Sequence, residues 1–431
     1  MKGTNVCRAG MLALAAGTCA LMQPTPAAST LRFPAETESQ QSIWLASPTI
    51  DYKKGWSMLG TQADMIGELV KGGRVEYLVN SPSDADALRT ALRARGIGNE
   101  TIAAHVGFHA VAHADLWVRD YGGLFLSDGA GNAQIVDFDF DGYGYDKYAN
   151  AAIRATYDFD NDLAVRVAHE IGVPVVRSTL IAEGGNLVFN GHGTVIATER
   201  GLLGRNPGWS KADVEAELAR AFRVSKVIWL PRGLATDANA VEQTPYDIDG
   251  ERIYNVGVNH ADEMAAWVGP RTVLLPEITA AEAARGNALV KLDREILENA
   301  YRILSSASDQ DGKPLTVIRA PAPDPIIVDI RPEDGIYQFL AGLHGLKGFV
   351  DGAPAKFALA ASYMNFVVTD NVVLVPKFYK NGRPRALEAK DAAFKRLVES
   401  LYPGRRVAQI DADAITAGGG GMHCISQQQP R

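Results

Sequence analysis

The chain has 431 residues, of which 47% are hydrophobic, and its formal net charge at pH 7 is −7. This length and composition can bury a large core, in one large domain or in two. The acidic balance argues against nucleic acid as a partner and favours small cationic partners. Beyond the N-terminal region no stretch has the ~20 apolar residues that a transmembrane helix needs, so we expect no membrane span.

The first residues predict an export signal. Lys2 and Arg8 form a short basic region, and residues 11–22 form an apolar run that is too short to span a bilayer. The small residues at 26–29 offer a cleavage site. We therefore expect residues 1–28 to be removed as a signal peptide, and the mature protein to be periplasmic or secreted.

Further along the chain, a β-rich run at 42–46 precedes four segments that each predict a hairpin. In each segment a polar residue precedes a β-rich run, a turn rich in Gly, Asn or Asp, and a second β-rich run. The polar residues are Asp120, Glu183, Asp262 and Asn365. The paired runs are 122–126 with 134–138, 184–189 with 194–197, 264–268 with 272–275, and 366–368 with 372–375.

Helical spacing of apolar residues occurs between these segments, at 84–92, 161–170, 280–299 and 386–401. The repeating unit is therefore a mixed β/α module, which appears four times with the polar residue at the same place. Cys424 provides a fifth polar position, and the run at 42–46 could complete its module by pairing with the C-terminus. A closed ring of five such modules would bring the five polar positions together around one axis.

The cysteines also single out position 424. Cys7 and Cys19 lie in the predicted export signal, so the mature chain keeps Cys424 alone, without a disulfide partner. A lipid on Cys19 is a weaker alternative, because Gly17-Thr18 is a poor approach to a lipidated cysteine. The four glycines at 418–421 let a ligand approach the main chain closely, which suggests an attacking thiolate. A small buried hydrophobe is an equal alternative on spacing alone.

The residues that the ring would gather suit attack on a planar, cationic carbon. Two carboxylates can hold a guanidinium through paired, charge-assisted hydrogen bonds. The positive charge placed beside a thiol lowers the thiol's pKa, and a nearby histidine can protonate the leaving amine and then activate water. The gathered residues are Asp120, Glu183, His260, Asp262, Asn365 and Cys424.

Each motif also has a structural interpretation. Asp120 could cap a turn and pair with Arg119, and Glu183 could begin a hairpin. The segment 260–263 mixes His, Asp and Glu, but no second histidine lies at ligand spacing, so a metal site is disfavoured there.

The remaining histidines are interpreted as ordinary residues. His105, His109 and His113 are four residues apart, and without further ligands nearby this spacing favours a surface face over a metal site. His423, next to Cys424, is placed in the same ordinary group.

Six motifs in the same order resemble one protein family. This is the family of bacterial agmatine deiminases and bacterial-type peptidylarginine deiminases, in the guanidine-modifying (pentein) superfamily. The resemblance implies a single deiminase domain over 29–431 and an α/β fold of five ββαβ-type modules in a ring with pseudo-five-fold symmetry, an α/β propeller. The motifs lie at 32–36 with 44–48, 117–122, 183–186, 260–263, 362–365 and 419–424.

The resemblance further implies the reaction and its central residues. The expected reaction is hydrolytic deimination of a guanidinium group with release of ammonia. Cys424 resembles the nucleophile, which would form a covalent amidino intermediate, and His260 resembles the acid and base. Asp120 and Asp262 match the carboxylates that grip the guanidinium.

Other residues match supporting positions of the family. Glu183 would orient His260, Asn365 would form a polar wall, and Trp117 and Arg119 would support the substrate site. No metal or organic cofactor is implied. The expected partner is a small cationic guanidine or an arginine-containing peptide, without nucleic acid or a membrane span, and a homodimer is among the expected oligomeric states.

The substrate is predicted from the segment after the first hairpin. Residues 136–146 contain four aspartates, and the first arginine after them is Arg154. A substrate carboxylate there would meet like charge without an arginine fork. We therefore expect agmatine (to N-carbamoylputrescine, a step of putrescine biosynthesis) or internal peptidyl-arginine (to citrulline) over free arginine, unless Arg154, Arg200 or Arg205 reaches the site. The alternatives are an amidinotransferase or free-arginine deiminase of the same superfamily, and a catalytically silent binding module.

Overall fold

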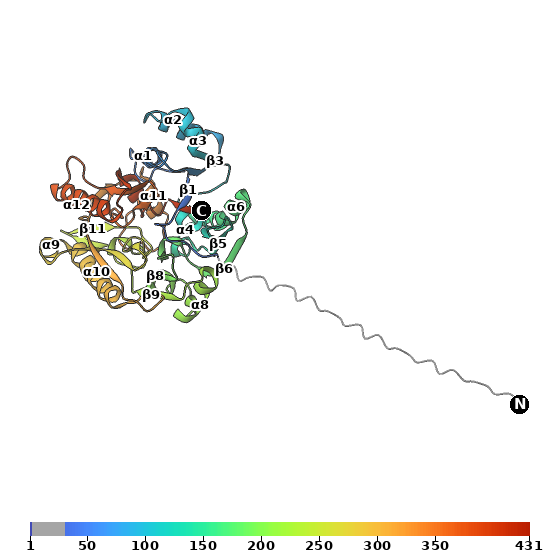
Figure 1. Cartoon of the computed structure of the whole chain (residues 1–431). Helices are drawn as coiled ribbons and strands as arrows, with labels where there is room; N and C mark the ends of the chain where they lie inside the picture. Colours follow the sequence, from blue (N-terminus) through green and yellow to red (C-terminus); the bar gives the residue numbers. More distant parts are fainter. Residues whose placement is uncertain (2–30) are drawn as a thin grey trace. The chain divides into compact units, whose positions relative to one another are not determined.

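Five of the six sheets in the described part of the chain share one strand pattern. Figure 1 shows the chain that contains them. The computed structural model describes Met1 and residues 31–431, and residues 31–431 form one unit. The expected export signal and its cleavage site lie outside the described residues, apart from Met1.

In each of the five sheets an antiparallel pair is extended by a parallel strand. Four sheets contain the four predicted hairpins, which are confirmed. They are β4 (Leu124–Ser127), β5 (Ala133–Asp139) and β6 (Val175–Ile181); β7 (Val188–Phe189), β8 (Thr194–Thr198) and β9 (Lys226–Leu230); β12 (Ala266–Gly269), β13 (Thr272–Glu277) and β14 (Thr316–Pro321); and β17 (Val367–Val368), β18 (Val372–Lys377) and β19 (Arg406–Asp411).

The fifth sheet joins the two ends of the described unit. Strand β1 (Gln40–Ala46) pairs antiparallel with β20 (Gln427–Pro430), as predicted, and parallel with β2 (Val75–Leu78). Strand β3 (Val106–His109) continues the sheet on the far side of β2. Figure 1 accordingly shows the C-terminus beside β1. The described strands form separate sheets, and none of these sheets closes on itself.

Helices connect the parallel strands, because a parallel pair needs a long crossover. In Figure 1, α2, α8, α10 and α12 lie at the periphery of the unit. The helices of these connections are α1 (Met58–Leu69), α2 (Pro82–Arg93), α3 (Asn99–His105), α5 (Ala151–Asp160), α6 (Leu163–Ile171), α7 (Glu199–Leu202), α8 (Lys211–Phe222), α9 (Ala280–Arg285), α10 (Ala288–Ser306) and α12 (Arg385–Leu401).

The expected helix at 280–299 is in fact two helices. The backbone of Gly286 is extended (ψ 162°), which ends α9, and the side chain of Asn287 accepts a hydrogen bond from the Val290 amide to begin α10. Glycine and asparagine favour such a break over a continuous helix.

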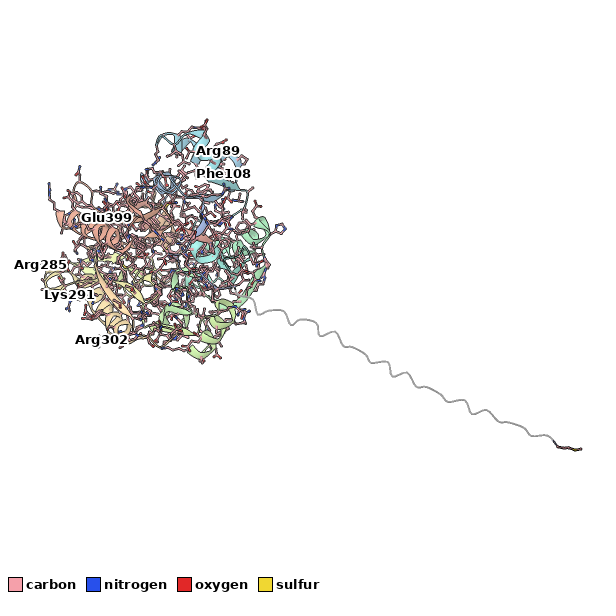
Figure 2. All side chains as sticks on the ribbon, viewed as in Figure 1. Arg89, Phe108, Arg285, Lys291, Arg302 and Glu399 are labelled. Carbon is pink, nitrogen blue, oxygen red and sulfur yellow. The ribbon has the colours of Figure 1, made fainter. Side chains whose placement is uncertain are left out.

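The buried apolar side chains of the described residues form three clusters. Strand β18 is buried from Val372 to Pro376, so it forms a continuous apolar run rather than an alternating one. Helix α10 buries one face and exposes Lys291 and Arg302, which Figure 2 shows at the periphery. No helix in the described part of the chain is both long enough and apolar enough to cross a bilayer.

The three histidines spaced by four do not share a surface face. His105 ends α3, His109 ends β3, and His113 is buried in the following loop, 3.0 Å from the Ser47 hydroxyl. The prediction was wrong because the chain changes from helix to strand at Val106. In Figure 2 the neighbouring Phe108 of β3 lies beside Arg89 of α2, whose guanidinium carbon is 4.3 Å from the ring centre.

A sixth sheet lies outside the repeat and was not predicted. It has the order β10 (Tyr246–Ile248), β11 (Glu251–Tyr254), β16 (Ala355–Ala358) and β15 (Ile327–Ile330), and α11 (Gly335–Ala341) follows β15. The remaining short elements are α4 (Val118–Tyr121), α13 (Asp413–Thr416) and the 3-10 turns η1 (Gly142–Gly144), η2 (Gly184–Asn186) and η3 (Ala235–Asp237).

Candidate active site

A cavity of about 510 Å³ reaches the side chain of Cys424. Of the residues predicted for the site, Trp117, Asp120, His260 and Cys424 line it directly. The others lie behind this wall: Glu183 contacts His260, and Asp262 and Asn365 contact Cys424. The structure therefore brings the six gathered residues together, although they are up to 304 residues apart in the chain.

Cys424 lies at the end of the glycine loop that follows α13. Its Sγ is 3.0 Å from Asn365 Nδ2, 3.5 Å from Asp262 Oδ2 and 3.9 Å from Glu263 Oε1. A Cβ on Gly420 would lie 2.8 Å from the Trp117 ring and 3.1 Å from the sulfur itself. Glycine at this position therefore leaves room between the sulfur and the ring of Trp117.

The protein's own groups do not favour a thiolate. Burial raises the pKa of Cys424 well above its usual value, and the carboxylates of Asp262, Glu263 and Asp120 raise it further. None of the described side chains that line the cavity is Arg or Lys, so the positive charge expected beside the thiol is that of the guanidinium held by the carboxylates. A cation supplied by the substrate is thus needed to lower the thiol's pKa.

His260 is buried between two carboxylates. Its Nε2 is 3.3 Å from Glu183 Oε2, and its Nδ1 is 3.8 Å from Asp120 Oδ1. Burial alone would lower the pKa of His260, but Asp120 and then the hydrogen bond to Glu183 raise it to about 9. The imidazole therefore carries a proton at neutral pH and can donate it to a leaving amine.

Glu183 is held by a buried arginine. Both terminal nitrogens of Arg205 bond to its carboxylate, and Arg205 Nη1 also lies 3.0 Å from Asp141 Oδ1. Burial alone would raise the pKa of Glu183, but Arg205 and then the hydrogen bond from His260 lower it to about 2. Arg205 was considered from the sequence as a partner for a substrate carboxylate. In the structure Arg205 instead holds Glu183 and does not line the cavity, so the expectation that it could bind a substrate carboxylate is corrected.

Asp120 is aimed at the cavity by two donors. The hydroxyl of Tyr143 donates to its Oδ2 at 2.9 Å, and the Gly185 amide donates to its Oδ1 at 3.0 Å. Tyr143 has the left-handed backbone angle φ 63°, which is uncommon for a bulky residue and is typical of functional positions. A Cβ on Gly185 would lie 2.5 Å from His260 Nδ1 and 2.8 Å from Asp120 Oδ1, which explains the second of the two glycines that follow Glu183.

The pKa of Asp120 is set by opposing effects. Burial raises its pKa, His260 lowers it, and Asp262 and Glu183 raise it again, to about 6. A cation in the cavity would shift this balance toward the carboxylate.

The two oxygens of Asp262 differ in their partners. Oδ2 lies 2.7 Å from His423 Nδ1 and 3.4 Å from Asn365 Nδ2, whereas Oδ1 is buried and has no hydrogen-bond partner. Leaving a buried carboxylate oxygen unpaired costs about 1–3 kcal/mol or more. Oδ1 therefore requires a donor from outside the protein, and a guanidinium N–H is suitable.

His423 is not an ordinary histidine. It is buried, with Nδ1 on Asp262 and Nε2 2.7 Å from Glu36 Oε1. Burial and then Arg119 would lower the pKa of His423, but Glu36 and Asp262 raise it overall. The sequence interpretation failed here because the partners of His423 are 161 and 387 residues away. Its only signal in the sequence is its place directly before Cys424.

Arg119 does not pair with Asp120 and does not line the cavity. It is almost fully buried (1% exposed), lies 3.2 Å from Glu36 Oε1, and donates through Nε to the His423 carbonyl at 3.3 Å. The alternative in which Asp120 caps a turn paired with its own arginine is therefore wrong. Arg119 instead holds the loop that contains Cys424.

Glu263 was missed as a site residue. It lines the cavity, accepts a hydrogen bond from Asn365 Nδ2 at 3.0 Å, and faces the sulfur of Cys424. Burial raises its pKa well above the usual value, and Asp262 and Asp237 raise it further. From the sequence Glu263 was considered as part of a metal site and of the motif at 260–263, but it was given no role in the reaction.

The aspartates of the segment 136–146 do not face the cavity. Only Tyr143 and Tyr145 of this segment line it, while Asp141 pairs with Arg205 and Asp137 lies 3.7 Å from Arg177. The like-charge argument drawn from these aspartates is therefore corrected. What remains unfavourable to a substrate carboxylate is a lining with four acids and, among the described residues, no Arg or Lys.

Comparison with known proteins gives a consistent result. The model of the Porphyromonas-type peptidyl-arginine deiminase family matches residues 32–430. The agmatine deiminase of Ectopseudomonas mendocina is 27% identical over 94% of this chain and 97% of its own length. The agmatine deiminase of Pseudomonas aeruginosa is 26% identical over 94% of this chain and 97% of its own length.

A solved structure has the same fold. The agmatine deiminase of Enterococcus faecalis superposes with a TM-score of 0.72, over 93% of this chain and 96% of that one, at 24% identity. A mixed α/β fold shared with this enzyme is therefore established.

Proposed function

The chain belongs to the Porphyromonas-type peptidyl-arginine deiminase family and is a hydrolase of the guanidino group, and from this premise we propose its substrate and its mechanism. The proposed substrate is an alkyl guanidine without a free carboxylate nearby, either agmatine or internal peptidyl-arginine. The products are N-carbamoylputrescine or peptidyl-citrulline, with ammonia. The observation that carries the proposal is the side chain of Asp262, whose Oδ2 lies 3.5 Å from the sulfur of Cys424 and whose buried Oδ1 has no hydrogen-bond partner in the described chain.

In the first step the guanidinium cation binds in the cavity and the thiol of Cys424 is deprotonated. The guanidinium donates hydrogen bonds to Asp120 and to Asp262 Oδ1, and its positive charge offsets the carboxylates that raise the pKa of Cys424. The thiol then releases its proton to solvent and the thiolate adds to the guanidinium carbon, which gives a neutral tetrahedral adduct.

The second step uses the proton of His260. The imidazolium protonates one amino group of the adduct, ammonia leaves, and a cationic amidino-thioether remains on Cys424. Neutral His260 then takes a proton from water, whose oxygen adds to the same carbon. The carbon–sulfur bond breaks as the new hydroxyl loses its proton, which releases the ureido product and restores the thiol.

Residues behind the cavity wall position the reacting groups. We assign Glu183 the role of orienting His260, Asn365 that of holding the sulfur, and Trp117 that of a wall beside the substrate. Glu36 and His423 position Asp262, and Arg119 positions Glu36. No step requires a metal or an organic cofactor.

A comparison of three substrates tests the function. The ureido product is measured with agmatine, free arginine and an N-acylated arginine amide at one ionic strength. We expect kcat/KM for agmatine or the amide to exceed that for free arginine, and no stimulation of turnover by an added amine acceptor. Cys424→Ala should keep its fold and form no product. Free arginine as the best substrate would contradict the substrate assignment, and activity in Cys424→Ala would contradict the mechanism.

We also propose that the five similar sheets are modules of one ring with pseudo-five-fold symmetry. Their shared strand order supports this, and so does the position of one site residue before the hairpin of each of four sheets and of Cys424 before β20 in the fifth. An experimental structure in which successive sheets are not related by similar rotations would contradict the ring.

A further inference from the structure

The cavity extends past the reacting groups into an outer part. Its inner end is formed by buried residues such as Trp117, His260 and Cys424. Its outer part is lined by the loop at 49–50 and by helices α5 and α11, where several side chains are partly or fully exposed. Ile50, for example, is 44% exposed.

The outer part is mainly apolar. Its large side chains are Ile50, Ile153, Tyr157, Ile336 and Phe339. Ile153 and Tyr157 are four residues apart on α5, so they lie on one face of this helix. Ile50 is exposed, Ile336 is buried and the other three are partly buried. An apolar lining that continues from a reaction site is typical of a surface that binds part of the substrate.

Helix α5 is anchored at both ends, although only Asp160 among its residues is buried. At its start the Asn150 amide donates to the Gly342 carbonyl at 2.9 Å, and a Cβ on Gly342 would lie 2.4 Å from Ile153 Cδ1. At its end Asp160 accepts hydrogen bonds from the amides of Ala114 and Asp115, at 2.7 and 2.9 Å. Helices α5 and α11 thus form a fixed wall that exists before substrate binds.

The size of the cavity exceeds the needs of a guanidine on a short alkyl chain. Volumes of roughly 300–1,000 Å³ usually hold drug-sized ligands and bury most of their surface. A substrate that fills only the inner end would leave the apolar outer wall in contact with water, without any gain from its burial.

The cavity lining also contains Asp115, which lies outside the loop at 49–50 and helices α5 and α11. Its carboxylate accepts hydrogen bonds from the Tyr52 hydroxyl at 2.7 Å and from the Leu116 amide at 2.8 Å, and burial raises its pKa. These donors occupy both oxygens, so the carboxylate is less available to a distal ammonium than an unpaired acid would be.

From this lining we propose that the outer part binds an apolar side chain next to the arginine of a peptide, so that arginines with an apolar neighbour are preferred. The inference rests on the proposed function and narrows its substrate. A hydrophobic pocket changes kcat/KM by about tenfold to two-hundredfold for a difference of one methylene.

Matched substrates test the preference. The substrates are acetyl-leucyl-arginine amide, acetyl-glycyl-arginine amide and agmatine, and kcat/KM is measured for each with the full-length protein. We expect the leucyl substrate to exceed the glycyl one by about tenfold or more. In Ile153→Ser the ratio should fall severalfold, whereas Ala155→Ser, an exposed position on the same helix that does not line the cavity, should keep it.

The possible failures are distinguishable. Equal kcat/KM for the two peptides, or an unchanged ratio in Ile153→Ser, would overturn the inference while leaving deimination intact. A preference for agmatine that Asp115→Asn abolishes would also overturn it, in favour of a distal ammonium site at Asp115. Hydrolysis of none of the three substrates would overturn the proposed function itself, and the inference with it.

Discussion

At the scale of single residues, the most demanding environment is that of the carboxylates around the sulfur. Asp120, Asp262 and Glu263 all approach Cys424 within one buried site, and each of them raises the pKa of the thiol. Such a cluster is costly when it is empty, because like charges are desolvated together. A bound cation offsets the repulsion between the carboxylates and also lowers the pKa of the thiol. A change that weakens substrate binding is therefore expected to weaken activation of the nucleophile as well.

Asp120 and Asp262 should therefore both be needed for catalysis. Asp120→Asn and Asp262→Asn keep the shape of the side chains but lose charge-assisted hydrogen bonds worth about 1.5–3 kcal/mol each. We expect kcat/KM to fall at least tenfold in either variant, measured with the best substrate of the panel. Wild-type kcat/KM in both variants would show that these residues do not hold the guanidinium.

The link from Glu36 through His423 to Asp262 should affect substrate binding without supporting the fold. In His423→Ala we expect KM to rise and kcat/KM to fall by about tenfold or more, because Asp262 loses the donor that orients it. His423→Asn, which restores a donor, should recover part of the loss. His192→Ala, at an exposed histidine, serves as the control. Equal effects of the alanine and asparagine variants would argue against positioning through a hydrogen bond.

His260 and Glu183 should set the alkaline limit of activity. The pKa of His260 is raised to about 9, so the proton that it donates is present below this pH and is lost as pH rises through about 9. Because Glu183 contributes to this increase, Glu183→Gln should lower the pKa of His260 and move the alkaline limb of kcat/KM to lower pH. The control is Glu215→Gln on the exposed face of α8, and thermal melting checks folding. If the alkaline limb of kcat/KM stays at the same pH in a folded Glu183→Gln variant, Glu183 does not contribute to the pKa of the group that limits activity.

The residues that sequence reasoning identified are those that stand directly before a predicted strand. Asp120, Glu183, Asp262 and Asn365 share this place, and the repeat predicts that they converge. Glu263 follows Asp262 and His423 precedes Cys424, so neither of them occupies the repeated position by which the other site residues were identified. Their importance depends on side-chain direction, which a repeat of modules does not specify.

At the scale of elements, hairpins were predictable and longer-range pairings were not. The four hairpins have turns rich in Gly, Asn or Asp between apolar runs, and these are local signals. Strand β10, by contrast, has only three residues, and β11 pairs with β16 about a hundred positions later. The sixth sheet and α11 therefore escaped prediction, and with them one wall of the cavity.

The glycine loop before Cys424 should be intolerant of even one added methyl group. In Gly420→Ala the new Cβ would lie 2.8 Å from the Trp117 ring and 3.1 Å from the sulfur. We expect at least a tenfold loss of kcat/KM, because the nucleophile or the ring must move. Gly98→Ala is a matched control, since its Cβ would meet nothing within 4 Å. Full activity in Gly420→Ala would show that the loop has more room than the structure indicates.

At the scale of the whole molecule, the mature protein is predicted to begin after residue 27 or 28. The basic, apolar and small-residue regions of the first 28 residues supply the reason. N-terminal sequencing of the protein from the periplasm or medium should give a start at Ala28 or Ser29. Lys2→Glu with Arg8→Glu should delay processing. A cytosolic protein that keeps Met1 would contradict export, and a lipid mass on Cys19 would favour the alternative.

The site is assembled from the whole described chain, and this has a consequence for biosynthesis. Its residues precede strands of five different sheets, and the nucleophile is followed by the strand β20 that pairs with β1. A nascent chain on the ribosome therefore holds no reactive site until codon 424 has been translated and the last strand has emerged. A nonsense mutation upstream of codon 424 yields a protein without this nucleophile, and we expect a proteolytic fragment that lacks β1 or β20 to be inactive.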